Sequence, residues 1–406
     1  MGTSAVTVRA VNGLTARWAS TVPPHSGTVF SAAGVWPLLA FLAAGAHGKA
    51  RSELAEAIGL PADHAGGAAR HMLESVDAMR GVDAAIGMWT NRTLELREQW
   101  RTGLPPGALG VFTGDPAADA AALDAWASKR TGGQIGRMPL HPGKDTEFVL
   151  ASALALRTEW FQPFAEGALS PESGPWAGRT LAALYRTTSL LDRVGVAETP
   201  AGSVTELKVI GDTGVDVHLL LGEASMSPGQ VLGAGVDILA RTRAVVPGPR
   251  LPYGDVGPGL SVRKVRRTHP VPPALDVTTV PFTLSARHDL LAHRTLFGLA
   301  TATTDRADGH FSGISPLPLA VKKGAQAATA TFGPLGFRAA AVTAFDACAV
   351  GIPHERYLTT EIDAVFDRPF GFLAVHRTSR LVLAAGWVSD PEPYREDEED
   401  DEDEER

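Results

Sequence analysis

Nine consecutive residues, Phe148–Leu156, constrain the fold more than any other stretch of this sequence. All of them are apolar except Ser152. A continuous apolar run of this length, rather than an alternating one, is typical of a strand that is buried on both faces. Such a strand needs a covering layer on each side of its sheet. The run therefore predicts a single mixed α and β domain with Phe148–Leu156 inside a central sheet.

The N-terminal part of the sequence predicts three helices. Apolar residues recur at helical spacing over Ala5–Ala19, which indicates an amphipathic helix. Val35–Ala44 is apolar on all sides, as in a helix buried at the centre of a protein, and Pro37 is expected in its first turn. Ala50–Ile58 predicts a third helix, and Gly59 follows it as a closing residue.

Further elements follow along the chain. Leu123–Ile135 predicts a helix with basic residues at its end and a glycine cap. The pair Val204–Val209 and Val215–Leu221 reads as a hairpin, whereas Pro247–Gly259 is rich in proline and glycine and reads as a loop. Leu381–Val388 is expected as a closing strand, and Ala374–His376, just before it, as another.

The charge of the chain is concentrated at its C-terminus. The whole chain of 406 residues has a formal net charge of −8, and residues 395–406, ten acidic residues between Arg395 and Arg406, carry all of it. The rest is formally neutral, which argues against a nucleic-acid-binding surface. We expect residues 1–393 to form one domain that ends near Asp390-Pro391, and residues 394–406 to be a disordered acidic tail.

Cysteine usage and the apolar runs indicate a cellular setting. Cys348 is the single cysteine, so no internal disulfide can form, which fits a reducing compartment. The first twenty residues do not resemble a signal peptide, and the longest apolar run, Val35–Ala46, is too short to cross a bilayer. We expect a cytoplasmic protein without a membrane partner, or an extracellular one if it is exported by a non-classical route.

The segment from Gly336 to Phe370 has the composition of a hinge followed by a surface loop. Glycine reaches backbone angles that other residues avoid, and the small side chains behind it would not resist entry into a packed sheet. The loop Asp346–Glu361 contains turn-forming residues and mixed polarity, so it should lie at the surface. The segment then reaches Phe366-Asp367-Arg368-Pro369-Phe370. The hinge residues are Gly336, Phe337, Arg338, Ala339, Ala340, Ala341, Val342 and Thr343.

This hinge, loop and Arg-Pro-Phe block resemble the serpin family of suicide protease inhibitors. Other blocks match the family in order: Phe30-Ser31 before the buried helix, Gly45–Gly48 after it, Thr131–Ile135, and strand, helix and loop segments between Leu275 and Ser315. The resemblance covers nearly the whole chain before the tail. It implies an α+β single domain with three β-sheets, about nine helices and an exposed reactive-centre loop. We interpret the chain as a divergent, bacterial-type member.

The resemblance also implies a function. A family inhibitor is metastable: a serine or cysteine protease cleaves its loop and is held as an acyl-enzyme while the loop inserts as a new central strand. The implied protein is a monomeric serine-type endopeptidase inhibitor and not an enzyme. Counting forward from the hinge places the bait bond at Val350–Gly351, and counting back from Pro369 places it near Leu358–Thr359. We prefer the first, because insertion length is the mechanical constraint.

Alternation within the hinge suits an inserted strand, whose side chains point to its two faces in turn. The even-numbered positions carry both charges, Arg338 and Asp346. The odd-numbered positions are apolar apart from one threonine; they are Phe337, Ala339, Ala341, Thr343, Phe345, Ala347 and Ala349.

The chain also departs from the inhibitory pattern. Phe337 replaces a small residue, Pro334 an acidic one, Gln326 a histidine and Ser152 an asparagine. Overpacking by Phe337 would cost roughly 1–3 kcal/mol at the gate, so the sequence alone predicts that Phe337→Thr raises the fraction of protease trapped. These departures support an alternative hypothesis, a non-inhibitory serpin-fold protein that binds a protein partner or a small ligand.

Other motifs do not indicate an enzyme, a cofactor or a metal. The spacing of Gly45, Gly48 and Lys49 does not fit a phosphate-binding loop, and Gly309–Gly313 lacks the central serine of a nucleophile elbow. The histidines form no metal-ligand motif. Cys348, in the predicted loop, reads as a small residue or as a redox-sensitive thiol.

Overall fold

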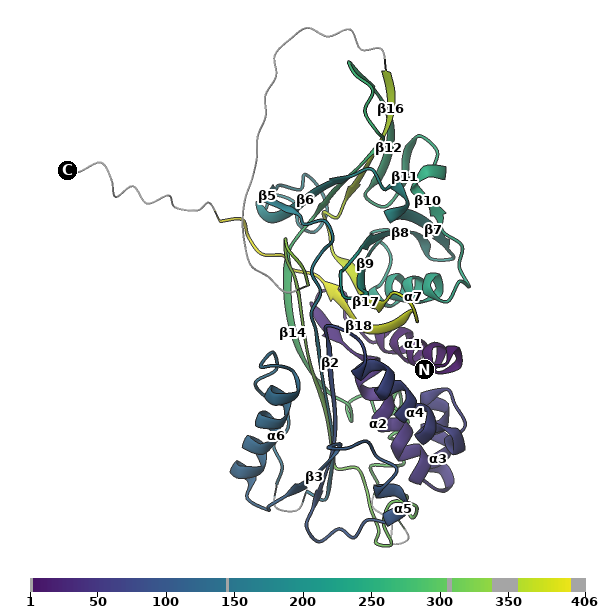
Figure 1. Cartoon of the computed structure of the whole chain (residues 1–406), viewed down its shortest axis with the longest axis vertical. Coiled ribbons are helices and arrows are strands. Elements are labelled where there is room, and N and C mark those ends of the chain that lie inside the picture. The colour runs from purple at the N-terminus through teal and green to yellow at the C-terminus, as the bar shows by residue number, and fades with distance from the viewer. Residues whose placement is uncertain (1–2, 144–145, 305–308, 338–356, 396–406) are drawn as a thin grey trace, which may run out of the picture.

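The computed structural model describes residues 3–143, 146–304, 309–337 and 357–395. Within these residues the chain folds into three β-sheets and seven α-helices, with α1–α4 gathered on one side (Figure 1). This architecture confirms the predicted fold class. The expected number of helices was about nine; the described residues hold the seven α-helices and two short 3-10 helices, Leu191–Arg193 and Gly248–Arg250.

The predicted helices are present, but the one predicted at Leu123–Ile135 begins at Pro116 and ends at Arg130, so residues 131–135 lie outside it. The α-helices are α1 (Ala5–Ala19), α2 (Ala32–Gly45), α3 (Gly48–Ile58), α4 (Ala62–Asp77), α5 (Glu98–Arg101), α6 (Pro116–Arg130) and α7 (Pro228–Leu239). The bounds of α1 are those predicted from its apolar spacing, and α3 ends before Gly59, which has a left-handed φ of 66°.

The buried helix α2 begins earlier than predicted. The Ser31 side chain accepts a hydrogen bond from the Gly34 N–H (3.0 Å), and this cap starts the helix at Ala32. Pro37 therefore lies inside the helix and not in its first turn. Every residue of α2 except Ala44 is buried, which confirms its central position.

The central sheet has five strands in the order β14-β15-β4-β2-β3. Strand β4 has the predicted bounds, and all of its residues are buried. It pairs in parallel with β15 on one side and antiparallel with β2 on the other. The strands are β14 (Phe282–Asp289), β15 (Lys323–Phe332), β4 (Phe148–Leu156), β2 (Val82–Asn91) and β3 (Leu109–Phe112).

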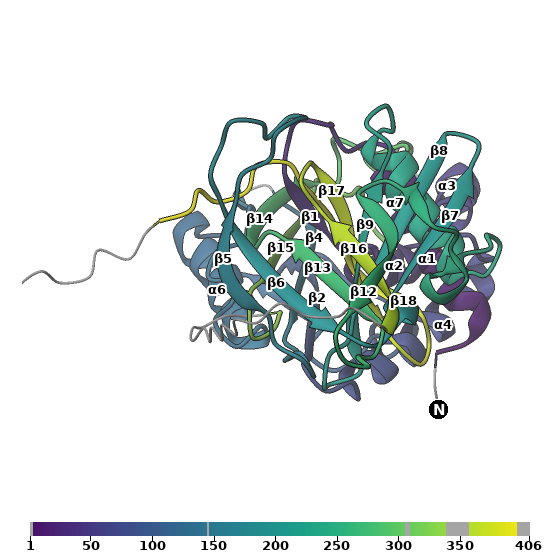
Figure 2. The same cartoon turned by 90° about the horizontal axis from the view of Figure 1, so that it is seen from above.

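Two further sheets complete the fold (Figure 2). The seven-stranded sheet has, in order, β1 (Thr28–Phe30), β18 (Leu381–Val388), β17 (Phe370–His376), β9 (Val215–Gly222), β8 (Gly202–Val209), β7 (Val194–Thr199) and β10 (Val246–Pro247). The six-stranded sheet has, in order, β11 (Gly254–Gly257), β12 (Leu260–Arg267), β16 (Tyr357–Val365), β13 (Ala274–Thr279), β6 (Leu181–Thr188) and β5 (Ala165–Leu169). The predicted hairpin is β8–β9, and the predicted closing strands are β17 and β18.

The two faces of β4 belong to different hydrophobic clusters. Phe148, Leu150 and Leu154 join the main core, which includes α2. Val149 and Ala151 join a smaller cluster with residues of α6, which lies across the central sheet from α2 (Figure 1). A strand covered on both faces explains the continuous apolar run in the sequence.

Three expectations need correction. The predicted loop Pro247–Gly259 contains β11, which pairs with β12. The helix expected after Asp289 is a series of turns in this structure. The packed part of the chain extends beyond Asp390-Pro391, because the Tyr394 N–H donates to the Thr180 carbonyl (3.0 Å). The acidic stretch 396–405 lies outside the described residues.

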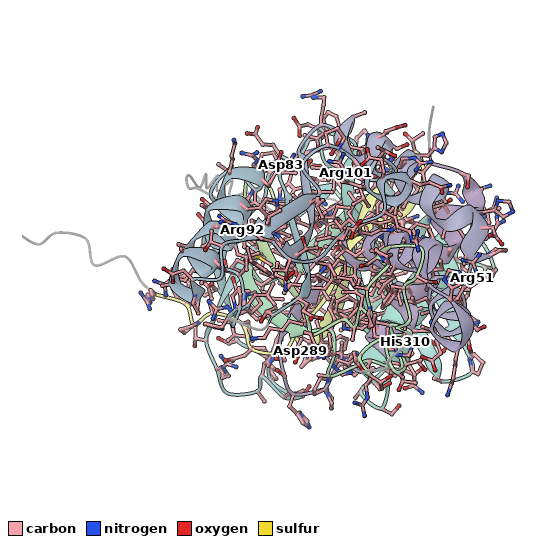
Figure 3. All side chains as sticks on the ribbon, turned by 90° about the horizontal axis from the view of Figure 1, so that it is seen from below. Arg51, Asp83, Arg92, Arg101, Asp289 and His310 are labelled. Carbon is pink, nitrogen blue, oxygen red and sulfur yellow. The ribbon has the colours of Figure 1, made fainter. Side chains whose placement is uncertain are left out.

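Charged side chains are spread over the molecule in the view from below. Arg51 and Asp289 lie well apart there (Figure 3). The described residues contain no group of three or more His, Cys, Asp and Glu side chains that could hold a metal ion. In the same part of the chain, no helix has the length and apolarity to span a bilayer.

Candidate functional site at the opening of the central sheet

Strands β4 and β15 pair with each other over only part of their length. Their parallel pairing runs from Val149 opposite Lys323 to Leu154 opposite Ala328. Beyond this point β4 continues to Leu156 and β15 to Phe332, without described pairing between them. Unpaired strand edges are templates for an additional strand. The central sheet is therefore open between β4 and β15 at the end where β15 leads into the hinge.

The chain turns back into this opening directly after β15. The Gly333 N–H donates to the Gly336 carbonyl (3.0 Å) and closes a tight turn. Gly336 then forms an antiparallel bridge with Glu159, just beyond the end of β4. Hydrogen bonds from Trp160 N to Leu335 O (2.9 Å) and from Phe337 N to Thr158 O (2.8 Å) flank the bridge. The first step of an antiparallel strand beside β4 has thus formed.

Gly336 is required here for close packing. The sequence predicts a flexible hinge at this glycine, but its φ lies outside the left-handed region. A Cβ atom at this position would lie 2.4 Å from the Thr158 carbonyl oxygen. The absence of a side chain lets the two backbones meet.

Phe337 is already inside the protein. Its side chain is 1% exposed, and its ring centroid lies 6.1 Å from that of Phe372 in β17. From the sequence, Phe337 is expected to be a bulky residue that must enter a filled site during insertion. The structure corrects this expectation, because the core already holds the ring. Phe337 anchors the start of the hinge.

Two departures from the family pattern, Gln326 and Ser152, meet Ser31 within the paired part of β4 and β15, and a third, Pro334, lies in the turn. Gln326 on β15 is opposite Ser152 on β4, and its Nε2 donates to the Ser152 Oγ (3.3 Å) and to the Ser31 carbonyl (2.8 Å). The Ser31 N–H donates to the Gln326 Oε1 (2.7 Å). Pro334, in the turn, accepts a hydrogen bond from the Phe164 N–H (2.9 Å). Gln326, Ser152 and Ser31 therefore join β15, β4 and the start of α2, in place of the histidine and asparagine of the family pattern.

Replacing Gln326 with Met should destabilise the native state. Gln326 is fully buried, and its loss leaves the Ser31 N–H and the Ser152 hydroxyl without their partner, whereas the Ser31 carbonyl keeps a bond from the Val35 N–H (3.3 Å). We expect a loss of about 1–3 kcal/mol, measured by urea unfolding. Ser152→Ala removes only the longer bond and is the matched control, with a smaller expected loss. Equal stability of Gln326→Met and the wild type would show that the cluster does not hold the strands together.

A cation lies beside the turn without an acidic partner. The Arg186 guanidinium on β6 stacks over the Phe164 ring at 4.2 Å, and its Nη1 donates to the Gln162 carbonyl (3.0 Å). Its Nε has no hydrogen-bond partner within the described part of the chain. Burial, together with the nearby positive charge of Arg193, lowers the pKa of Arg186 to about 10.

Replacing Arg186 with Met should therefore stabilise the native state. The depressed pKa means that the folded protein disfavours the charged guanidinium; this cost is fully present at neutral pH and declines only above pH 10. An apolar side chain of similar size removes the cost, and we expect a gain of about 1–3 kcal/mol. Thermal and urea unfolding at pH 7 measure it. A loss of stability would mean that stacking on Phe164 outweighs desolvation.

The predicted bait loop lies outside the described residues. This applies to Arg338, Ala339, Ala340, Ala341, Val342 and Thr343, to Cys348, and to the predicted bait residues Val350 and Gly351. The alternative bait bond at Leu358–Thr359 falls within β16, where these residues pair with Arg266 and Val265 of β12. A bond held in a strand is a poorer bait than one in a free loop. This favours Val350–Gly351, the bond placed by counting forward from the hinge.

Sequence reasoning missed β15 and the buried Phe337. Lys323–Phe332 is rich in alanine and lacks the β-branched and large apolar residues that usually indicate a strand. The side chain at position 337 follows a glycine and precedes Arg338, and nothing in that pattern shows that it packs against Phe372.

Comparison with known proteins agrees with this geometry. Residues 7–173 match the family model described as Serpin (serine protease inhibitor). A putative serpin-Z6C from Oryza sativa subsp. japonica is 27% identical over 184 residues, which cover 41% of this chain and 44% of that protein. The alignment thus spans less than half the length of this curated relative. A bacterial type remains a prediction from the sequence.

Solved structures share the fold over almost the whole chain. Human thyroxine-binding globulin, complexed with thyroxine, has a TM-score of 0.70 and 17% identity, and the match covers 96% of this chain and 98% of that one. Native protease nexin-1 with heparin has a TM-score of 0.71 and 16% identity, covering 96% and 100%. At these identities the likeness shows the fold alone. The family model that matches residues 7–173 and this shared fold both agree with the resemblance of the chain to the serpin family.

Proposed function

We propose that this protein is a serine-type endopeptidase inhibitor that traps its target by suicide-substrate loop insertion, and that it is not itself an enzyme. The observation that carries the proposal is the antiparallel bridge between Gly336 and Glu159 at the opening between β4 and β15. Gly336 and Phe337, the two described residues of the hinge, already pair with the chain beyond β4 along the path that an inserting strand would take. Insertion would extend pairing that exists in the native state.

The register of this extension follows from two independent counts. Stepping back along β4 from the Glu159–Gly336 bridge, one residue at a time on each side, places Thr343 opposite Ser152. Stepping back along β15 from the Gly333–Gly336 turn places Thr343 opposite Gln326. Ser152 and Gln326 are already opposite each other. The two strands therefore need to move apart sideways but do not need to slide.

This register also fits the chemistry of the two faces. Even-numbered β4 residues such as Leu150 and Leu154 face the main core, and their partners would be the odd-numbered hinge residues. These are apolar except Thr343, which would meet the polar Ser152–Gln326 pair. On the opposite face, Asp346 would come to lie beside Lys323 of β15.

The same register supports Val350–Gly351 as the bait bond. Pairing with β4 from Gly336 onward would end with Ala347 opposite Phe148, the first residue of that strand. A bait bond after Val350 would lie just past the end of the sheet. A protease attached there by an acyl bond would be carried along the whole strand, roughly 3.3 Å per residue.

The experiment is incubation of the full chain with elastase-like and subtilisin-like proteases, followed by denaturing gel electrophoresis. An acyl-enzyme survives denaturation as a band at the summed mass. We expect this band, together with some cleaved protein. Cleavage without any covalent band, for proteases of both classes, would reject the inhibitor proposal.

One observation favours a second candidate, a non-inhibitory serpin-fold protein that binds a partner or a small ligand. The buried Phe337 fixes the start of the hinge in the core, and in this candidate that anchor would hold the loop back from insertion. A fold neighbour, thyroxine-binding globulin, is described in complex with thyroxine. Clean cleavage with release of the protease would support this candidate.

We further propose that the target is a serine or cysteine protease; one fold neighbour, mouse protein-Z dependent protease inhibitor, is by its name a protease inhibitor. The protein would act as a monomer, because the inserted strand comes from its own chain. Size-exclusion chromatography with light scattering tests this.

A further inference from the structure

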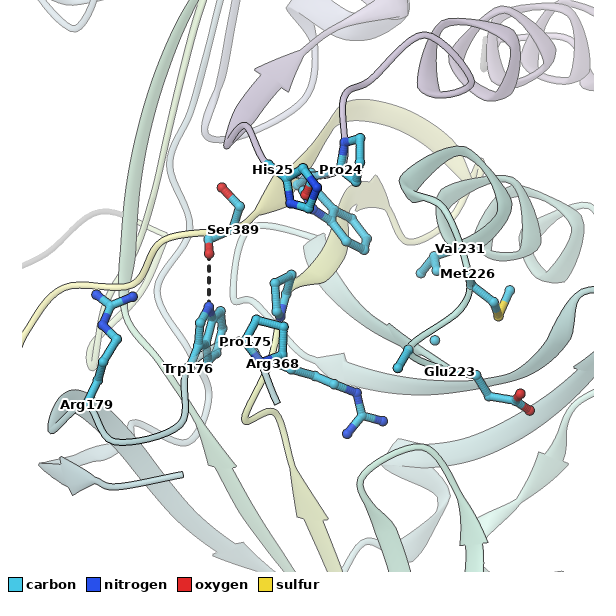
Figure 4. Close-up of a pocket in the computed structure, with 14 residues that line it drawn as sticks. Pro24, His25, Pro175, Trp176, Arg179, Glu223, Met226, Val231, Arg368 and Ser389 are labelled. Carbon is cyan, nitrogen blue, oxygen red and sulfur yellow. Dashed lines mark hydrogen bonds between the residues drawn. The ribbon is translucent and has the colours of Figure 1, made fainter. Parts of the chain in front are cut away.

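A pocket of about 280 Å³ lies at the end of the seven-stranded sheet, away from the sheet opening (Figure 4). It forms where β9 and β18 end and where β17 begins. The connection between β5 and β6 closes one side, and the segment before β1 closes another. None of its lining residues belongs to the turn at Gly333–Gly336 or to the Ser152–Gln326 cluster. It is a separate site.

Buried aromatic and aliphatic side chains form the floor of the pocket. Trp176, Trp387, Met226 and Val231 line it, and each is less than one tenth exposed. The Trp176 Nε1–H donates to the Ser389 carbonyl (2.9 Å), and the Trp387 Nε1–H donates to the carbonyl of Pro24 (3.1 Å). Both indole rings are therefore fixed with their polar groups satisfied. The pocket is preformed and presents apolar faces.

One cation in the wall has unused hydrogen-bonding capacity. The Arg368 side chain contacts its neighbour Asp367 (Nη1 to Oδ1, 3.3 Å), and its Nε has no partner among the described residues. The Arg368 side chain is 25% exposed. By contrast, Arg179 binds Asp390 (2.8 Å) and donates to a backbone carbonyl (2.9 Å). Since a guanidinium carries five donors, Arg368 can still bind an anion.

Acidic groups limit how much negative charge the site can take. Glu223 also lines the pocket, but its carboxylate accepts the Ser203 N–H (2.8 Å) and points away from Trp176 (Figure 4). A neighbouring hollow of about 450 Å³ shares Arg368 and Glu223 and adds Asp255. A ligand with a second anionic group reaching into that hollow would meet these two carboxylates.

We propose that this pocket binds a small aromatic monocarboxylate, with its rings against Trp176 and Trp387 and its carboxylate on the terminal nitrogens of Arg368. The volume lies near the lower end of ligand pockets, roughly 300–1,000 Å³, and suits two fused rings. Arg is the side chain best matched to a planar carboxylate, because its donors form a fork. The inference does not depend on protease inhibition.

The test uses the full chain and two matched probes, naphthalene-2-carboxylate and the uncharged naphthalene-2-carboxamide. Titration calorimetry gives each Kd, and quenching of tryptophan fluorescence locates binding at Trp176 and Trp387. We expect one site and at least tenfold tighter binding of the carboxylate than of the carboxamide. Arg368→Gln should abolish this preference, and the exposed Arg9→Gln should leave it unchanged.

A second variant covers the case in which Arg368→Gln fails to fold. Met226→Trp places a larger ring in the pocket and should abolish binding of both probes while the melting temperature stays near that of the wild type. Equal affinities of the wild type for the two probes would overturn the proposal. So would carboxylate binding that survives Met226→Trp.

Discussion

A carboxylate at position 341 should abolish covalent trapping, whereas the same change one residue earlier should not. In the proposed register Ala341 pairs with Leu154 and enters the main core, so Ala341→Asp would bury an unpaired charge. This costs several kcal/mol, and each 1.4 kcal/mol or so is a factor of ten in the partition between insertion and release. Ala340→Asp would place its charge on the other face, beside the partly exposed Thr329 of β15 and next to Arg338, with which it could pair.

The measurement is the ratio of covalent complex to cleaved protein on a denaturing gel, for both variants and the wild type. The bait bond should be cleaved at similar rates in the two variants, because neither residue 340 nor residue 341 is next to it. We expect no complex with Ala341→Asp and at least half of the wild-type complex with Ala340→Asp. If the two variants behaved alike, the register would be wrong, even if the protein inhibits.

Replacing Phe337 should have a large effect on the stability of the protein and little effect on the fraction of protease trapped. The side chain is buried against Phe372, and Phe337→Ala should lower the free energy of unfolding by about 3–5 kcal/mol. In the proposed register Phe337 keeps its place opposite Thr158 before and after insertion. The native and inserted states would lose the same contact, so the trapped fraction should change little.

This reverses the expectation drawn from the sequence, in which Phe337→Thr relieves crowding and raises trapping. Urea unfolding and the gel ratio decide between them, with Phe337→Leu as a milder control that keeps most of the apolar volume. If Phe337→Thr leaves the stability unchanged and traps more protease, the expectation from the sequence, that Phe337 crowds the insertion site, would be correct.

The sequence predicted those parts of the fold that depend on local pattern. The continuous apolar run of β4 fits only a strand buried on both faces, and the spacing in α1 fits only a helix buried on one face. Both elements have the predicted bounds. The cap on α2 was not predicted, because Ser31 is also engaged with Gln326, which is distant in sequence. The resemblance to a family supplied the overall arrangement of the sheets, which no local pattern contains.

The candidate site was predicted only as a list of residues. Gln326 and Ser152 each read as a departure from the family pattern, and the structure shows that they bond to each other. Gly336 read as a flexible hinge because its contact with Thr158 joins segments far apart in sequence. Such pairings depend on strand register, and one sequence does not reveal which strands are neighbours.

The most direct test of the central claim is the melting temperature of the protein before and after its loop is cleaved. If the loop inserts between β4 and β15, the central sheet gains a strand with hydrogen bonds on both sides, and the cleaved protein should melt well above the intact one. Cleaved Ala341→Asp should show no such rise. A cleaved wild-type protein that melts at or below the temperature of the intact protein would contradict loop insertion.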